Sequence, residues 1–224
     1  MVKAIIFDAD GPLYYRTDLS SQKLEALLKD FGYCGDVKEF KRAYESEKFK
    51  AYVRFETEAE MDHKILQSIG VQISLSEAEI FAKKFDVIQR QVTATANAIA
   101  ALKQLKNEDY KICVLTDSFY SSQEKWSWFK TLGMDMYIDH IVSSYDIRKL
   151  KDTPEAYQIC LDSLGTNADE TVFVGHQEYE MTGARASKIT SIAVIPIATP
   201  GIHSDYKVNS LSELPELLKK INRI

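Results

Sequence analysis

The chain has 224 residues, 45% of them hydrophobic and 27% charged, with a formal net charge of −5 at pH 7. This length and composition exclude a disordered chain and favour one core domain that carries a sizeable insertion. The 28 basic residues are fewer than the 33 acidic ones and both signs are interspersed, so the composition predicts neither a nucleic-acid partner nor an acidic tail.

The sequence also indicates a compartment. No apolar run approaches the roughly 20 residues of a membrane span, and the apolar N-terminal run ends in acids, unlike a signal peptide. Cys34, Cys113 and Cys160 lie far apart and none belongs to a CxxC pair, which predicts free thiols in a reducing compartment. We therefore expect a soluble, cytoplasmic protein without a membrane partner.

The first predicted element is a strand at residues 3–7 (KAIIF), a short apolar run typical of a strand buried on both faces. It ends in the polar turn DADGP. Residues 17–92 then predict helices with no convincing strand between them, at 22–31, 37–52, 57–69 and 76–92. The last two open with capping boxes, Thr57 with Glu60 and Ser76 with Glu79. The aromatic residues expected mostly in the core of this helical block are Phe40, Tyr44, Phe49, Tyr52 and Phe55.

From about residue 95 the predicted elements alternate between helices and strands. The expected strands are 110–115, 138–142, 171–174 and 191–195. The expected helices are 96–106, 121–132, 154–164 and 180–187, with a last helix capped by Ser210 and Glu213. Alternation of this kind predicts an α/β fold, a Rossmann-like parallel sheet covered on both faces. The predicted core domain comprises 1–16 and 93–224, and 17–92 form an all-helical insertion.

Polar side chains follow the predicted strands, where parallel sheets bind their ligands. These residues are Asp8 and Asp10, then Thr116 and Asp117, then Lys151, and finally His176, Glu178 and Glu180. We expect them to converge on one site. Carboxylates, a hydroxyl and a lysine together suit a phosphate with a hard divalent cation.

Four motifs in chain order resemble those of the haloacid dehalogenase-like (HAD) superfamily of phosphohydrolases. FDADG is similar to the first motif, DxDG after an apolar strand, and ICVLT to the second, which ends in Ser or Thr. KDTPEAY resembles the third, a lysine before a helix, and VFVGHQEYEMTGA the fourth, an apolar strand followed by GDxxxD. The helical insertion resembles the family's helical cap, so the resemblance covers nearly the whole chain.

The resemblance implies hydrolysis of a small phosphorylated metabolite. Asp8 would be the nucleophile that forms an aspartyl-phosphate, and Asp10 the general acid and then base. The implied phosphate-binding residues are Thr116, Asp117 and Lys151. Asp8, Asp10 through its carbonyl, and Glu180 would hold Mg²⁺. Because the family's dehalogenases lack an acid at the position of Asp10, the resemblance favours a phosphatase.

Two positions depart from the family pattern. Pro12 follows DxDG, where the family has Thr or Val, and His176 replaces the first Asp of the fourth motif. A neutral imidazole is a poor Mg²⁺ ligand, so we expect a weakened metal site for which Glu180, or else Glu178, compensates. The alternative functions are therefore a catalytically weak or inactive phosphate- or partner-binding protein, and a phosphomutase.

Several residues keep a second interpretation. Asp8 and Asp10 also suit an ordinary turn after a strand, and Lys149 competes with Lys151 for the lysine position. His176 is compatible with a metal ligand, a phosphate contact or a spectator on a loop. Glu180 also suits a helix N-terminus, where the helix dipole favours negative charge.

Overall fold

The computed structural model describes residues 1–223, which form two compact units. Unit 1 contains Met1–Tyr15 and the chain from Ala94 onward, and unit 2 is Arg16–Thr93. The short strands β2 (Tyr14–Tyr15) and β3 (Thr93–Ala94) pair in a two-stranded sheet where the chain passes from one unit to the other.

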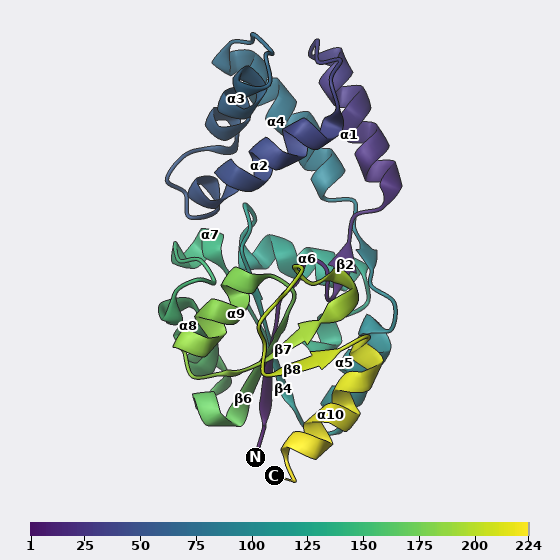
Figure 1. Cartoon of the computed structure of the whole chain (residues 1–224), viewed down its shortest axis with the longest axis vertical. Coiled ribbons are helices and arrows are strands. Elements are labelled where there is room, and N and C mark those ends of the chain that lie inside the picture. The colour runs from purple at the N-terminus through teal and green to yellow at the C-terminus, as the bar shows by residue number, and fades with distance from the viewer. Residues whose placement is uncertain (224) are drawn as a thin grey trace. The chain divides into compact units, whose positions relative to one another are not determined.

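A six-stranded sheet forms the centre of unit 1 (Figure 1). Its strands are β1 (Ala4–Phe7), β4 (Lys111–Thr116), β5 (His140–Ser143), β6 (Thr171–Gly175), β7 (Thr190–Val194) and β8 (Tyr206–Val208). Their spatial order is β5-β4-β1-β6-β7-β8, and every neighbouring pair is parallel. The four residues of β1 have no exposed surface, as expected for a central strand covered on both faces.

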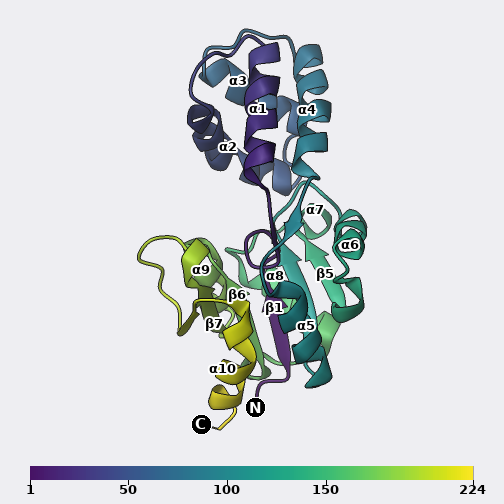
Figure 2. The same ribbon diagram turned by 90° about the vertical axis from the view of Figure 1, so that its right-hand side faces the viewer.

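Helices cover both faces of this sheet (Figures 1 and 2). They are α5 (Ala98–Asn107), α6 (Ser122–Thr131), α7 (Ser144–Ile147), α8 (Pro154–Leu164), α9 (Glu178–Ala186) and α10 (Leu214–Ile221). Four short 3₁₀ segments are η1 (Asp135–Tyr137), η2 (Ala168–Glu170), η3 (Ile195–Ile197) and η4 (Leu211–Glu213). Figure 1 shows α8 and α9 on one face and α5 and α10 on the other. On the α8–α9 face, Ile6, Cys113 and Phe173 share one buried core with residues of both helices. The α/β fold predicted from the alternation of elements is confirmed.

The register of the sheet positions the strand ends. Phe7 of β1 pairs with Val114 of β4 on one side and with Val174 of β6 on the other. Asp8, the next residue, donates its backbone N–H to the Val174 carbonyl at 2.9 Å. The end of β1 therefore lies between the ends of β4 and β6, at the edge where parallel sheets bind ligands.

Unit 2 is all helical, as predicted. Its helices are α1 (Asp18–Asp30), α2 (Val37–Tyr52), α3 (Glu58–Ser68) and α4 (Leu75–Gln89). The Phe40 ring packs against the Phe81 and Phe85 rings at centroid distances of 5.7 and 5.6 Å. Phe40 is buried as expected, whereas the expectation is wrong for Phe55, whose side chain is 83% exposed.

Several element boundaries differ from the sequence prediction. The capping box of α4 is formed by Ser74 and Glu77, two residues before the predicted pair, because both pairs have the same spacing and the helix begins earlier. Ser210 caps η4 instead of the last helix. Helix α9 begins at Glu178, so Glu180 lies inside its first turn. The sequence pattern missed α7 and β8, since elements of three or four residues are too short to show a period.

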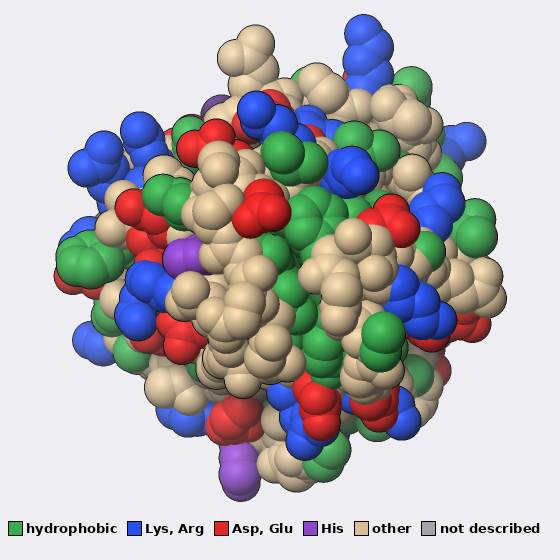
Figure 3. All heavy atoms as spheres, turned by 90° about the horizontal axis from the view of Figure 1, so that it is seen from above, with side chains coloured by type: hydrophobic (Ala, Val, Ile, Leu, Met, Phe, Trp, Pro, Cys, Tyr) green, Lys and Arg blue, Asp and Glu red, His purple; other side chains and the backbone are tan. Residues whose placement is uncertain are grey.

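The surface charge and the cysteines agree with the expectations from the composition. Figure 3 shows a face on which basic and acidic side chains are interspersed. The three cysteines are free thiols, as predicted. Within residues 1–223, none of the helices combines the length and the apolar character that crossing a bilayer requires.

Candidate active site

Three charged side chains meet beyond the end of β1. The Lys151 Nζ donates to Asp8 Oδ1 and to Glu180 Oε1, both at 2.5 Å. The exposed fraction of each of these side chains is 4% or less. Lys149, the competing lysine, is exposed, so the structure brings Lys151 and not Lys149 to Asp8. A buried ion pair of this kind requires close geometry, because each charge loses its hydration.

The backbone of Lys151 is held from two sides. Its N–H lies 3.3 Å from both carboxylate oxygens of Asp117, and the Tyr179 hydroxyl donates to the same carboxylate at 3.1 Å. On the other side, Gly183 of α9 packs against the Lys151 carbonyl, where a Cβ atom would lie 1.8 Å from the oxygen. The carboxylate of Asp117 therefore positions Lys151. A contact between Asp117 and phosphate stays a prediction, and in this structure the carboxylate is engaged by Lys151 and Tyr179.

Glu180 is fixed by the start of α9. Its Oε2 accepts the backbone N–H groups of His176 and Gln177, each at 3.0 Å, so that Gln177 and Glu180 form a capping box. The Tyr157 hydroxyl donates to the Glu180 carbonyl at 2.7 Å. The helix N-terminus and the lysine together stabilise a buried negative charge at Glu180. Both interpretations of Glu180, as a helix-terminal charge and as a site residue, are therefore compatible with its position.

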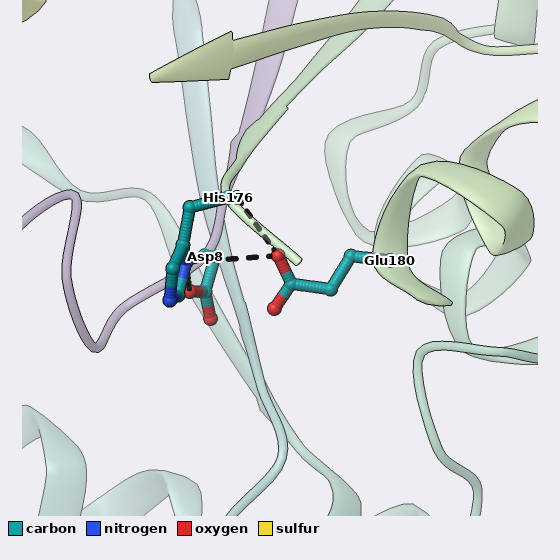
Figure 4. Close-up of side chains that lie close together, drawn as sticks. All are labelled: Asp8, His176 and Glu180. Atoms are coloured by element: carbon teal, nitrogen blue, oxygen red, sulfur yellow. Dashed lines mark hydrogen bonds and ion pairs between the residues drawn. The ribbon is translucent and has the colours of Figure 1, made fainter. Parts of the chain in front are cut away.

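His176 lies against the nucleophile candidate (Figure 4). Its Nδ1 is 3.1 Å from Asp8 Oδ2 and 3.8 Å from Glu180 Oε2, yet it is buried and makes no aligned hydrogen bond. The ring also packs on Gly11, where a Cβ would lie 3.1 Å from His176 Cε1. Gly11 has φ +100°, a conformation that favours glycine. The imidazole therefore belongs to the site and is not a spectator on a loop.

The charges of the site determine its protonation. Burial disfavours the charged form of Asp8, but Lys151 and His176 outweigh it and lower the Asp8 pKa to about 2. Burial would lower the pKa of Lys151, but Asp8 and Glu180 raise it well above its ordinary value. Burial likewise opposes the charge of His176, while Asp8 raises its pKa above the ordinary value. At neutral pH, Asp8 is therefore a carboxylate and Lys151 an ammonium group.

The remaining predicted residues are Thr116, Asp10 and Glu178. Thr116 is buried at the end of β4, two residues past Val114, which pairs with Phe7. Asp10 is half-buried in the turn after β1, which the Gly11 N–H closes by donating to the Tyr14 carbonyl at 2.6 Å. Glu178, the alternative acid, faces His203 instead, since it accepts the His203 backbone N–H at 2.8 Å. The structure therefore does not bring Glu178 to Asp8.

The sequence analysis missed several residues that build the site. Gln177, Tyr179 and Tyr157 contact His176, Asp117 and Glu180, respectively, and Thr199 donates to the Gln177 side chain at 3.2 Å. Gln177 is not one of the usual N-cap residues, so its pairing with Glu180 did not match the capping-box pattern in the sequence. The tyrosine contacts were not detectable either, because they join separate helices and loops.

The cluster has the donors of a metal site. One ligand atom from each of Asp8, His176 and Glu180 lies within 4.8 Å of the other two. The buried Nδ1 without a hydrogen bond is an atom that a cation would satisfy. The three groups therefore fit a divalent cation, with a nitrogen where the resemblance implies an aspartate oxygen. The predicted contribution of the Asp10 carbonyl to the metal site stays a prediction.

The comparison with known proteins agrees with the fold. Residues 5–194 match the family model of haloacid dehalogenase-like hydrolases. The chain therefore belongs to this family of hydrolases.

Its relatives have more than one activity. The chain is 27% identical over 135 residues to (S)-2-haloacid dehalogenase 4A of Burkholderia cepacia, covering 58% of each chain. It is 24% identical over 123 residues to the pyrophosphatase PpaX of Halalkalibacterium halodurans, covering 52% of this chain and 56% of the relative. The match thus spans little more than half the length of these curated relatives.

A solved structure shares the fold over almost the entire chain. This structure, of a predicted phosphoglycolate phosphatase from Haemophilus somnus, superposes with a TM-score of 0.75 and 14% identity, covering 97% of this chain and 98% of the other. At that identity the likeness shows the fold alone.

Proposed function

We propose that this chain is a phosphohydrolase that acts on a small phosphorylated metabolite through an aspartyl-phosphate on Asp8. The observation that carries the proposal is the buried Asp8–Lys151 pair at the ligand-binding edge of the sheet. A carboxylate with a pKa of about 2 is ionised at neutral pH and is therefore available as a nucleophile. Asp10, two residues further on, supplies the second acid that hydrolysis of a phosphate ester needs.

In the proposed reaction, a carboxylate oxygen of Asp8 attacks phosphorus and the bond to the ester oxygen breaks. Asp10 gives its proton to the departing oxygen. Asp10 then takes a proton from water, which attacks the aspartyl-phosphate and restores Asp8 with release of phosphate. Lys151 neutralises charge on Asp8 and the phosphate, and Thr116 donates to a phosphoryl oxygen.

Charge repulsion is the barrier that the site must overcome. Two like unit charges 4 Å apart cost about 4 kcal/mol at an effective dielectric constant near 20. Lys151 removes part of this repulsion. A divalent cation, when bound, would neutralise much of the remainder by polarising the phosphoryl oxygens. Mg²⁺ is the ion implied by the resemblance, and Asp8, Glu180 and His176 are the residues that would hold it.

Asp10 supports a phosphatase over a dehalogenase. A halide leaves as an anion and needs no proton, whereas an alkoxide leaving group does. The similarity to a named dehalogenase does not weigh against this, because the chain also resembles a named pyrophosphatase to a comparable degree. His176 is the feature that favours the second candidate, a catalytically weak or inactive phosphate-binding protein.

Hydrolysis of an aryl phosphate in the presence of Mg²⁺, and separately of Mn²⁺, tests the proposal. We expect turnover by the wild type and none by Asp8→Asn. Asp169→Asn is the matched control, because Asp169 is exposed and precedes β6 at the opposite edge of the sheet. Equal rates for wild type and Asp8→Asn would refute the proposal. If turnover appears only in His176→Asp, the natural chain is not an efficient phosphatase and the second candidate is favoured.

A further inference from the structure

We infer that Asp8, His176 and Glu180 form a site for a divalent transition-metal ion of the Mn²⁺, Co²⁺, Ni²⁺ and Zn²⁺ class, which binds in preference to Mg²⁺. The inference deepens the proposed function and rests on it for the role of the ion in the reaction. The binding preference itself rests only on the ligands and their geometry.

The first observation is the position of the His176 Nδ1. It lies 3.1 Å from Asp8 Oδ2 and 3.8 Å from Glu180 Oε2. Ligand atoms around one ion, with bonds of about 2.1 Å, lie about 3.0–3.4 Å apart for octahedral or tetrahedral angles. The first distance already lies in this range and the second is longer, while all three ligand atoms lie within 4.8 Å of one another. The Nδ1 is also buried and makes no aligned hydrogen bond, with the Asp8 carboxylate as the group that it faces, so an ion bound here would take the place of the Nδ1 proton.

The second observation is the chemistry of the donors. Mg²⁺ prefers oxygen ligands in octahedral geometry and loses its water reluctantly. Imidazole nitrogen suits later divalent ions, and the affinity of a mixed nitrogen and oxygen site rises from Mn²⁺ towards Cu²⁺. Two carboxylates with one imidazole therefore favour a transition-metal ion, whereas three carboxylates would favour Mg²⁺.

The third observation is the support behind the ring. The side-chain amide of Gln177 lies 2.9 Å from His176 Nε2, the ring nitrogen that faces away from Asp8. Histidine ligands of metals bond their second nitrogen in this way, and the bond fixes the tautomer and the ring orientation. In the structure the amide nitrogen of Gln177 faces Nε2 and the amide oxygen accepts from Thr199. Flipping the amide would bring its oxygen to Nε2, so that Nε2 carries the proton and Nδ1 offers its lone pair to an ion. The Thr199 hydroxyl both donates and accepts, so it can bond the Gln177 amide in either orientation.

The fourth observation is the space for the ring. Gly11 packs against the imidazole, and a Cβ at this position would lie 3.1 Å from His176 Cε1 and 3.3 Å from Nε2. The turn after β1 and the start of α9 therefore hold the ring on two sides. The imidazole is therefore held with its Nδ1 towards Asp8.

Direct binding to the metal-depleted chain tests the inference without substrate. We expect Mn²⁺ to bind at least about tenfold more tightly than Mg²⁺. Mn²⁺ binding is monitored by the loss of the EPR signal of the free ion, and Mg²⁺ affinity is measured by competition with Mn²⁺. Bound Co²⁺ should show visible bands typical of nitrogen ligation, and these bands should be lost in His176→Ala. His176→Asp should reverse the preference towards Mg²⁺. His140→Ala is the matched control, because His140 is exposed at the start of β5 and should bind both ions as the wild type does.

The outcomes separate this inference from the proposed function. Equal affinity for Mn²⁺ and Mg²⁺ in the wild type, absence of binding, or cobalt bands unchanged in His176→Ala would each overturn the inference. The wild-type comparison needs no variant, so a variant that fails to fold leaves the test intact. If the expected binding occurs and aryl phosphate is not hydrolysed, the inference stands and the phosphohydrolase proposal fails.

Discussion

Lys151 Nζ lies 2.5 Å from Asp8 Oδ1, although the two residues are 143 positions apart in the chain. Both side chains are buried, and the same lysine also neutralises Glu180. The ammonium group is therefore shared by two buried carboxylates, and its removal leaves both charges without this partner. The chain's two tryptophans, Trp126 and Trp128, lie on α6, so their fluorescence reports the unfolding of unit 1.

The first prediction concerns this lysine. We expect Lys151→Met to lower the free energy of unfolding of unit 1 by about 3–5 kcal/mol, because breaking a buried ion pair leaves uncompensated charge. Urea unfolding followed by tryptophan fluorescence measures the change. Lys149→Met is the matched control, since Lys149 is exposed and should change the value by no more than about 0.5 kcal/mol. Similar losses for the two variants would contradict the assignment of Lys151.

The second prediction concerns the contact between α9 and the Lys151 loop. A Cβ at Gly183 would lie 1.8 Å from the Lys151 carbonyl oxygen, so Gly183→Ala must displace the helix or the loop. We expect a loss of about 1–3 kcal/mol or more, measured as above, despite the better helix propensity of alanine. Thr182→Ala, an exposed neighbour on α9, should be nearly neutral. A stabilised Gly183→Ala would show that α9 does not approach Lys151 this closely.

The third prediction concerns pH. Burial raises the pKa of Asp117 to about 6, with Lys151 opposing the shift. The folded chain then binds a proton at Asp117 over a pH range in which the unfolded chain does not. The free energy of unfolding therefore falls as the pH rises from about 4 to about 6, and this residue contributes about 2–3 kcal/mol to the fall.

Asp117→Asn removes that titration. We expect the stability of the variant, measured without metal, to depend less steeply on pH between about 4 and about 6 than that of the wild type. Asp8 contributes little to the pH dependence of stability in this range, because its pKa of about 2 places its titration in the folded chain at lower pH. The stability that the ionised Asp8 contributes is lost as the pH falls below the ordinary carboxyl pKa. Parallel pH profiles for wild type and Asp117→Asn would contradict the buried position of this carboxylate.

The fourth prediction follows from the proposed role of Asp10. Asp10→Asn should lower kcat about 10²–10⁴-fold on an alkyl phosphate, because the leaving alkoxide needs a proton. The loss should be much smaller on an aryl phosphate with an acidic phenol leaving group, which serves as the internal control. We also expect no release of chloride from 2-chloropropionate by the wild type. Equal losses on both phosphates would argue against Asp10 as the general acid.

The sequence predicted the fold well because the signals for it are local. The apolar run before Asp8 predicted a buried central strand, and the helix–strand alternation predicted the parallel sheet. It was less accurate at boundaries, where Ser74 and Ser76 offer the same capping pattern and only the packed helix selects one. The same locality explains why polar residues at strand ends were found as site candidates.

The sequence by itself determined which residue types follow the strands, including Asp8, Lys151 and His176. Only the tertiary structure decided which of them meet. In the folded chain, Lys151 and not Lys149 contacts Asp8, and Asp117 accepts the backbone N–H of Lys151. Glu178 accepts the backbone N–H of His203, and the His176 ring lies against Asp8. These contacts depend on the strand register and on the close packing of α9 at Gly183. Because they join segments that are far apart in the chain, they leave no local pattern in the sequence.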